Sequence, residues 1–218
     1  MSNGENLTAA MAIPPILRLA FRPLFLGGTL FSIIAISWWA YFWVAPFNWQ
    51  PYGGPIWWHG HEMLFGFGAA IVVGFLLTAV QSWTGVPGLK GRKLAILAGA
   101  WLLGRLLIAF GGDLPGGLVA IGDLSFLLLG SIAMAHPVLK AKQWRNLMFV
   151  PILLVLMLLN GASHWGALNE GPQLALQSLH GATLLIALVV TIIGGRVIPF
   201  FTSNASNYIR LPNIGWLD

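Results

Sequence analysis

Long apolar runs separated by short polar segments form the dominant pattern of this chain. Six of these runs approach the ~20 residues that an α-helix needs to cross the hydrocarbon core of a bilayer. The connections between them are short and rich in glycine, proline and asparagine, as is typical of antiparallel helices. The pattern predicts an all-α, polytopic membrane bundle of about six transmembrane helices. The predicted spans are Leu24–Ala45, His61–Gln81, Lys93–Gly111, Gly117–His136, Leu147–His164 and Leu174–Ile198.

The same pattern divides the chain into three regions. Residues 1–23 contain Pro14, Pro15 and Pro23, which limit helix formation, and we expect this segment to lie along the cytoplasmic interface. Residues 24–198 form the predicted six-helix transmembrane bundle, and residues 199–218 form a predicted cytoplasmic tail. The first apolar run is too long for a signal peptide, so we expect it to be retained as a span.

Basic residues occur in alternate connections. They precede the first run, follow the second and fourth runs, and lie at the end of the sixth, whereas the other three connections contain no lysine or arginine. Cytoplasmic loops of membrane proteins carry an excess of these two residues. The distribution therefore predicts that both termini are cytoplasmic and that the three connections without basic residues lie on the outer side.

Composition narrows the class of protein and its chemistry. Hydrophobic residues make up 57% of the 218 residues and charged residues only 8%, whereas a soluble domain carries about 25% charged residues. The basic residues behind the net charge of +5 lie mainly in short loops. Their distribution therefore indicates the membrane topology of the chain, and we expect no nucleic-acid partner. The chain has no cysteine, which excludes iron–sulfur clusters, thiolate zinc, blue copper and covalently attached haem.

The stretch Trp57–Met63, with the sequence Trp-Trp-His-Gly-His-Glu-Met, carries the strongest chemical signal. Ionisable groups at the edge of hydrocarbon are costly and usually serve metal, haem or proton chemistry. His59 and His61 lie there, His164 ends the fifth run on the same side, and His180 lies about 9 Å into the sixth run. From spacing alone, a metal or haem site and simple interfacial placement are about equally supported, because residues two apart diverge in a regular helix.

Two charged residues lie inside the predicted spans. Arg105 and Asp123 occupy nearly equal depths, about 9 Å from the outer ends of consecutive antiparallel helices. Because a lone charge in hydrocarbon costs several kcal/mol, we expect the two side chains to pair. The pair either fixes helix packing alone or also belongs to the site, where Arg105 can meet a haem propionate or a bound anion.

Three weaker patterns concern the inner faces of the helices. Asn160 lies one turn before His164 and is predicted to orient that imidazole. Small residues recur every fourth position in the second run, which favours close helix packing and also suits a flat ligand laid against the backbone: Gly66, Ala70, Gly74 and Thr78. Polar residues recur at helical spacing in the sixth run and are expected to face the bundle interior: Gln173, Gln177, His180 and Thr191.

Taken together, several motifs in order along the chain resemble the NnrS family. They comprise Phe21-Arg22-Pro23, Trp58–Met63 with Gly66-Phe67, Gly74–Ala79, Ser82–Gly85, Gly104-Arg105 and Gly195–Thr202. The resemblance implies a multi-pass protein of the bacterial inner membrane that contains haem and copper, with a role in denitrification and in tolerance of nitric oxide. His59, His61, Glu62, Arg105 and Arg196 match motif residues of the family.

The resemblance does not say which side chains bind the cofactors, so we assign them as hypotheses. For a non-covalent, b-type haem we assign His59 and His180 as ligands, with Arg105 and Arg196 as further contacts. For copper we assign His61, Met63 and His164, with Glu62 as a proton relay or a carboxylate that supports a ligand. The expected partners are the lipid bilayer and nitric oxide or a related small ligand.

The chain differs from the family in length, because its members are about twice as long with about twice as many spans. A fragment, a truncated product and a short relative all fit this difference, and the matched part is the N-terminal half. We therefore expect a homo-oligomer or a C-terminal half to complete the cofactor shell.

Two other classes of function remain open from the sequence. The first is a small-solute or proton transporter in which Glu62, Arg105, Asp123 and His180 form a polar path. The concentration of polar residues at one side of the membrane argues against a complete path. The second is a structural membrane subunit of a larger oxidase, whose tryptophans only mark interfaces and partner contacts.

Overall fold

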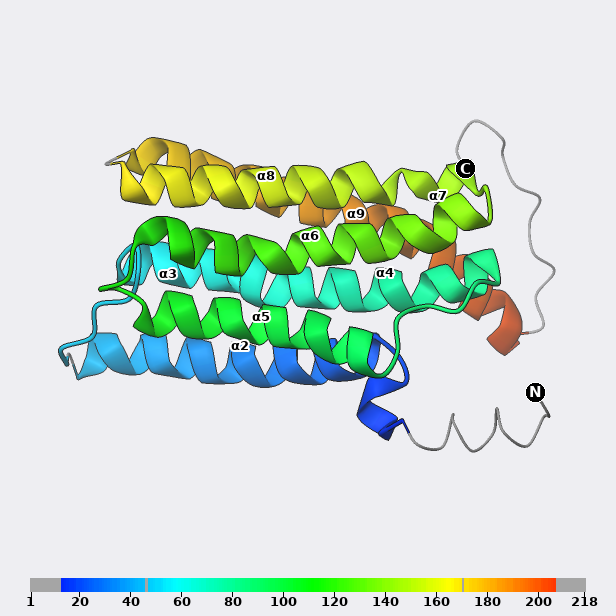
Figure 1. The fold of residues 1–218 in the computed structure, drawn as a ribbon, viewed down its shortest axis with the longest axis horizontal. Coiled ribbons are helices and arrows are strands. Elements are labelled where there is room, and N and C mark those ends of the chain that lie inside the picture. Colours follow the sequence, from blue (N-terminus) through cyan, green and yellow to red (C-terminus); the bar gives the residue numbers. More distant parts are fainter. Residues whose placement is uncertain (1–12, 46, 170, 207–218) are drawn as a thin grey trace.

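A computed structural model describes residues 13–45, 47–169 and 171–206 of the chain (Figure 1). These residues form helices joined by short connections, with no strand among them. The predicted tail beyond Ser206 and the first twelve residues lie outside the described part. The elements in order are a 3-10 turn η1 (Pro15–Leu17), α2 (Phe21–Val44), α3 (Pro55–His61), a π-helix η2 (Glu62–Gly68), α4 (Ala69–Thr84), α5 (Arg92–Phe110), α6 (Gly116–Lys140), α7 (Trp144–Leu147), α8 (Phe149–Leu168) and α9 (Pro172–Ser206).

Six helical segments are long and apolar enough to cross a membrane, which confirms the predicted all-α membrane bundle. Most of the predicted bounds agree with the helices to within a few residues. The second and sixth spans differ most. In the second, α3, η2 and α4 form one continuous helical segment from Pro55 to Thr84, and in the sixth, α9 continues to Ser206, beyond the predicted Ile198 and into the predicted tail. His59, predicted to lie just before the span, therefore lies within it, and His61 and Glu62 lie further into the span than predicted.

The connections fall at two ends of the bundle. One end carries the connections at residues 45–54, 111–115 and 169–171, and the other carries those at 85–91 and 141–143 (Figure 1). We call the first the outer end after the predicted orientation, which stays a prediction. The second end carries Lys90, Lys142 and the other basic residues of the loops.

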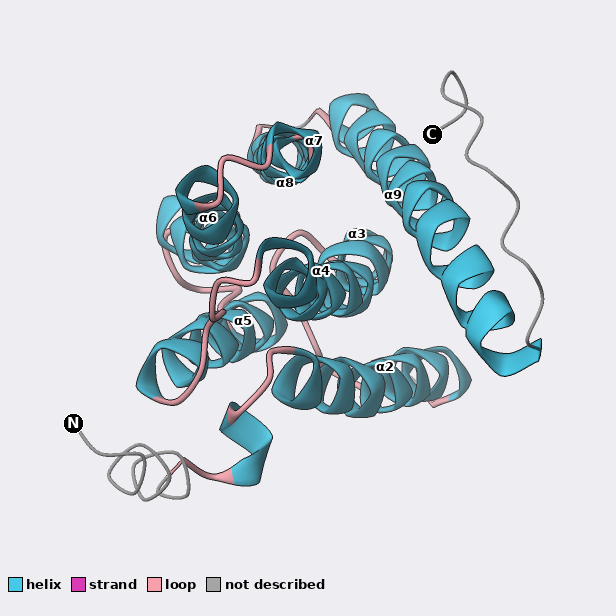
Figure 2. Cartoon of the chain, turned by 90° about the vertical axis from the view of Figure 1, so that its right-hand side faces the viewer, coloured by secondary structure: helices cyan, strands magenta, loops and turns pink. Residues whose placement is uncertain are grey.

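The segment α3–η2–α4 lies at the centre of the bundle. Figure 2 shows α4 enclosed by α2, α5, α6 and α9, and contacts join α4 to α2, α6 and α9. In the most apolar window of each span, 56% of the residues of Pro55–Thr84 are buried, against 6% for α9. The second span is thus the core of the fold, and α9 is its most peripheral helix.

The small residues of the second span allow close contact between α4 and α2. A Cβ placed on Gly28 would lie 3.3 Å from the Cβ of Ala70, and one on Gly74 would lie 3.1 Å from the Cβ of Leu24. One turn further, the Thr78 hydroxyl accepts a hydrogen bond from the backbone N–H of Phe21 at 3.0 Å. In the described structure, these residues therefore serve helix packing.

The polar stripe of α9 faces outward, so the expectation that it faces the interior is wrong for the described chain. Gln173, Gln177, His180 and Thr191 are all exposed. The physical reason is that α9 turns a different, smaller and more apolar face to the bundle, made of Ala175, Ser178, Leu179, Ala182 and Val189.

The close approach at Gly66 gives a first prediction. A Cβ at this position would lie 2.6 Å from Arg105 Nη1, 2.7 Å from Glu62 Oε2 and 2.7 Å from the Phe31 ring. We expect Gly66→Ala to lower the free energy of unfolding by about 2 kcal/mol, because overpacking a tight core forces its neighbours to shift. Unfolding of the detergent-solubilised protein by dodecyl sulfate, followed by tryptophan fluorescence, measures this change.

Gly99 of α5 supplies the matched control. A Cβ there meets nothing within 4 Å, and alanine forms helix more readily than glycine. Gly99→Ala should leave the stability unchanged or raise it slightly. Equal effects of the two substitutions would contradict the packing described at Gly66.

Candidate metal centre

The site begins with the turn that leads into α3. Gly53 and Gly54 have φ angles of +73° and +81°, which glycine adopts without strain. A Cβ on Gly53 would also collide with the Trp57 ring. Pro55 then starts α3, where its fixed φ suits the first helical turn and its missing N–H leaves no unpaired donor. This tight turn brings Tyr52 and His61 to the same region of the outer end.

His61 and His59 point in different directions, as their spacing on a helix predicts. His61 is fully buried and faces α6 and α8. His59 is half-buried and stacks on the Trp39 ring of α2, with ring centroids 4.0 Å apart. Gly60 therefore does not bring the two imidazoles together, and they belong to different surroundings.

Both ring nitrogens of His61 have partners. Nδ1 lies 3.1 Å from Oε1 of Glu62, the first residue of η2. Nε2 lies 2.7 Å from Oδ1 of Asn160 on α8 and 3.3 Å from Oδ2 of Asp123 on α6. The imidazole is thus held between a carboxylate on its own helix and two polar side chains on neighbouring helices.

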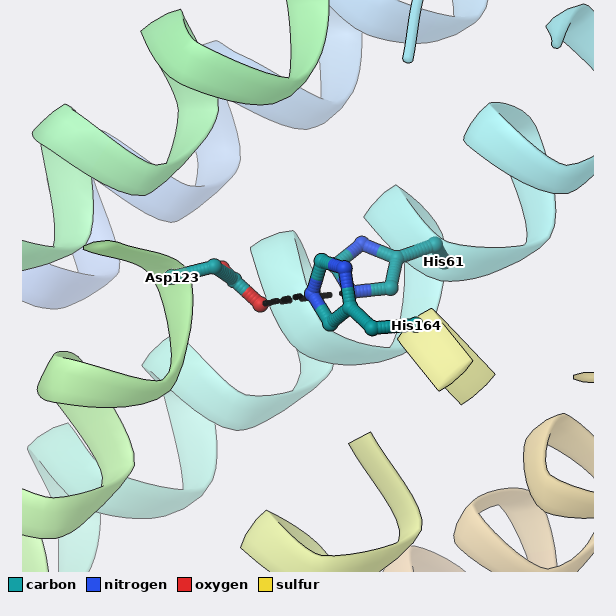
Figure 3. Close-up of side chains that lie close together, drawn as sticks. All are labelled: His61, Asp123 and His164. Atoms are coloured by element: carbon teal, nitrogen blue, oxygen red, sulfur yellow. Dashed lines mark hydrogen bonds and ion pairs between the residues drawn. The ribbon is translucent and has the colours of Figure 1, made fainter. Parts of the chain in front are cut away.

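Asp123 is the centre of the network. Its Oδ2 lies 3.1 Å from Nε2 of His164 and accepts a hydrogen bond from Nδ2 of Asn160 at 2.7 Å. Its Oδ1 forms an ion pair with Nη2 of Arg105. Figure 3 shows the two imidazoles reaching the carboxylate together.

Arg105 joins the two carboxylates. Its Nη1 donates to Oε2 of Glu62 at 3.1 Å, while Nη2 pairs with Asp123. The Phe31 ring lies 5.9 Å from the guanidinium carbon. The predicted pairing of Arg105 with Asp123 is confirmed, and Glu62 makes it a three-residue network.

Tyr52 links His164 to the outer loops. Its hydroxyl lies 3.2 Å from Nδ1 of His164, and its side chain is buried although the residue belongs to a connection. Burial, together with the nearby Asp123 carboxylate, raises the pKa of Tyr52 to about 12. The phenol therefore stays neutral at physiological pH and can either donate or accept a hydrogen bond.

Aromatic rings cover the histidines. The Trp57 ring stacks on His61 with centroids 4.5 Å apart, and it meets His164 edge-on at 5.3 Å. Its indole N–H donates to the hydroxyl of Ser163 at 2.8 Å. Phe65 lies 4.9 Å from His61 on another side. These rings help to bury the two imidazoles, which are 0% and 1% exposed.

His61, Asp123 and His164 form a cluster that could hold a metal ion. One nitrogen of each imidazole and one carboxylate oxygen lie within 4.8 Å of one another. Two imidazoles and a carboxylate are ligands that transition metals accept. Because both imidazoles approach one carboxylate oxygen, no room remains between them for a haem, and the cluster fits a bare ion.

The structure brings together some of the residues predicted for copper. His61 and His164 meet, and Glu62 supports His61 through Nδ1. Met63 does not join them, since it is half-buried and packs against the hydrophobic core.

The residues predicted for haem do not converge. Arg105 belongs to the cluster, whereas Arg196 contacts Asn146 and the Phe149 ring near the other end of the bundle. His180 is exposed on α9, and no hydrogen bond or ring contact joins it to His59 among the described residues.

Three residues have roles that the sequence did not assign. Asp123 was expected to pair with Arg105 or to belong to a polar path, and it was not named as a neighbour of His61 and His164, which were counted at the outer ends of their spans. Asn160 contacts His61 and Asp123, and so the prediction that it orients His164 is wrong. Tyr52 gave no signal, because its place follows from the turn at Gly53 and Gly54.

Removal of Arg105 provides a second prediction. Arg105→Gln leaves Glu62 and Asp123 without their cation, and we expect the free energy of unfolding to fall by about 3 kcal/mol. Adding Asp123→Asn should produce less than the sum of the two single changes, since the residues share one network. The exposed Arg145 is the control, and Arg145→Gln should change stability by less than about 0.5 kcal/mol. Additive effects in dodecyl sulfate titrations would argue against the network.

Comparison with known proteins identifies the family of the chain. The family model described as NnrS protein matches residues 15–218, which is nearly the whole chain. A search of curated proteins and a search of solved structures each found no match. The family match confirms the resemblance predicted from the motifs, and the chain belongs to the NnrS family.

Proposed function

We propose that this chain is a metal-binding protein of the bacterial inner membrane that takes part in the response to nitric oxide, with copper at His61, Asp123 and His164. Membership of the NnrS family suggests the nitric oxide response. The observation that carries the metal centre is the convergence of two imidazoles on one buried carboxylate. Six apolar helices support the placement in a membrane.

The hydrogen bonds behind the histidines support this proposal. Both Nε2 atoms point to Asp123, and each Nδ1 has its own partner, Glu62 for His61 and Tyr52 for His164. Metal-binding histidines almost always use their second nitrogen in this way, which fixes the tautomer and the ring orientation. A structural histidine in a core needs no such alignment of two rings.

The charge of the cluster also favours a cation. The cluster contains two carboxylates, Glu62 and Asp123, and one guanidinium, Arg105, and all three are buried among apolar side chains. With neutral imidazoles the group carries one excess negative charge, which is costly in a medium of low dielectric constant. A proton on a histidine or a bound metal ion removes this excess, so metal binding should release protons.

Copper suits the donors that the chain offers. The chain has no thiolate, and imidazole nitrogen is a good ligand for copper. A bound copper ion supplies one-electron chemistry and a coordination position for a small ligand. The protein supplies the two imidazoles, the Asp123 carboxylate, and the aromatic rings of Trp57 and Phe65 packed against His61.

Haem is the less supported half of the proposal. His59 remains our candidate ligand, because its Nδ1 is buried without a hydrogen-bond partner in the described structure and its ring lies against Trp39 and away from the cluster. The described residues bring it no second ligand. We therefore assign no chemical step to haem in this chain.

Transport is less favoured by the distribution of buried polar side chains. Glu62, Arg105 and Asp123 do meet, as the transporter hypothesis requires. Toward the inner end, however, the buried side chains of α4 are apolar: Val72, Val73, Leu76, Leu77 and Val80. Among the described residues, the network reaches only toward the outer end.

The metal centre yields a third prediction. The purified protein should bind copper in proportion to the chain, and His61→Ala and His164→Ala should each abolish this binding. Glu62→Gln should weaken it about 10- to 100-fold, because it loosens the partner of a ligand. Equilibrium dialysis with metal analysis measures these affinities, and electron paramagnetic resonance reports nitrogen ligands.

His136→Ala is the matched control, since His136 is exposed on α6 and far from the cluster in the chain. It should bind copper as the unchanged protein does. If copper binding survives in His61→Ala and His164→Ala, the assigned centre is wrong. If the wild-type protein binds no metal, the transport and structural-subunit hypotheses would be favoured instead.

The haem assignment gives a fourth prediction. A reduced-minus-oxidised visible spectrum of the purified chain should show a Soret band that shifts when nitric oxide is added, because haem iron binds this ligand. The band should be lost in His59→Ala and kept in His136→Ala. The reverse pattern would refute His59 as the ligand.

A further inference from the structure

A cavity of about 500 Å³ lies among the outer loops of the bundle. It is lined by residues of the connections after α2 and α5 and by the ends of α6 and α8, including Asn48, Gln50, Asp113 and Leu168. Tyr52 also lines it. The same residue hydrogen-bonds His164, so one side chain touches both the cavity and the buried cluster.

We propose that small uncharged molecules, of the size of imidazole or a diatomic gas, reach the His61–Asp123–His164 cluster through this cavity, on its His164 side, with the Tyr52 side chain as the movable partition. That this route carries a ligand to a bound metal rests on the proposed function. The route itself is a property of the fold and can be measured without metal.

The two histidines differ in what surrounds them. His61 is enclosed by Trp57 and Phe65 and by polar contacts from Glu62, Asn160 and Asp123. None of these residues lines the cavity. His164, in contrast, has the cavity-lining Tyr52 at its Nδ1. A molecule that enters from the cavity therefore meets His164 before His61.

Tyr52 is built so that its side chain can move while its backbone stays in place. The Tyr52 backbone N–H donates to the carbonyl of Ile108 at 3.1 Å, which ties the loop to the end of α5. The side chain has one hydrogen bond, to His164 Nδ1, and packs edge-on against the Trp57 ring at 5.4 Å. Rotation of the phenol breaks that single bond and opens His164 to the cavity, whereas His61 would need several contacts to break.

The lining favours uncharged molecules over anions. Among the described residues that line it, Asp113 is the one charged side chain, and none is lysine or arginine. An acidic side chain in a confined space repels anions. Neutral molecules face no such barrier.

The absence of cysteine from the chain makes a direct test available. Single cysteines are introduced as His164→Cys, His61→Cys and Tyr52→Cys, and the metal-free proteins in detergent are treated with methyl methanethiosulfonate, a small uncharged thiol reagent. The reactivity of a thiol follows its exposure. We therefore expect His164→Cys and Tyr52→Cys to react at least about tenfold faster than His61→Cys. Size-exclusion chromatography establishes that each variant is folded, and Tyr52→Cys tests the route even if His164→Cys does not fold.

Blocking the cavity tests the route more sharply. Asn48→Trp places a large side chain in the lining of the cavity. The matched control is Asn169→Trp, which adds the same side chain at an exposed residue of the same end that does not line the cavity. We expect Asn48→Trp to slow labelling of His164→Cys by about tenfold and Asn169→Trp to leave it within about twofold. Equal labelling of positions 61 and 164, or no effect of Asn48→Trp on His164→Cys and Tyr52→Cys, would overturn the proposal.

Copper binding separates this inference from the proposed function. If the wild-type protein binds no copper but the labelling pattern holds, the route stands and the metal centre fails. If copper binds and the labelling pattern fails, the metal centre stands and the route is wrong. In the copper-binding case, added imidazole should restore copper to His164→Gly and not to His61→Gly, and rescue of both or of neither would also count against the route.

Discussion

The fold depends on the contact that one buried guanidinium makes with two buried carboxylates. Glu62 and Asp123 come from different helices, and Arg105 of a third helix contacts both. Each of these charges would be strongly unfavourable alone in a membrane interior. Their shared contact fixes α5 and α6 against the central helix at one depth. That depth is where the imidazoles of His61 and His164 meet, so the same electrostatic constraint that joins the helices also shapes the candidate metal centre.

The sequence predicted the helices well because length and hydropathy determine a membrane span. It also predicted the Arg105–Asp123 pair, since residue counting gives depth along antiparallel helices. It did not predict which face of α9 is buried. The polar stripe with His180 suggested an inward face, but the small residues Ala175 and Ala182 pack against the bundle instead. In a bilayer, packing of small residues competes with the placement of polar ones.

The candidate site was predicted in part for a similar reason. His61, His164 and Glu62 were identified as candidates by their chemistry, yet Asp123, and not Met63, lies beside the two imidazoles. Glu62–Gly68 forms a π-helix, whose wider turn changes the direction of the side chains that follow relative to a continuous α-helix. This local geometry, like the loop that carries Tyr52, has no signature in a hydropathy pattern. The partners of a buried group therefore had to come from the three-dimensional arrangement.

The position of Arg105 and Asp123 on consecutive helices has a consequence for how the protein is made. A short connection at residues 111–115 joins α5 to α6, so the two charges meet within a single helical hairpin. A charge at the centre of a helix that inserts alone costs about 2.5–3.5 kcal/mol during translocon-mediated insertion. A hairpin that inserts as a unit carries a neutral pair and avoids much of this penalty. The ion pair that joins the helices thus also lowers the cost of inserting this hairpin into the membrane.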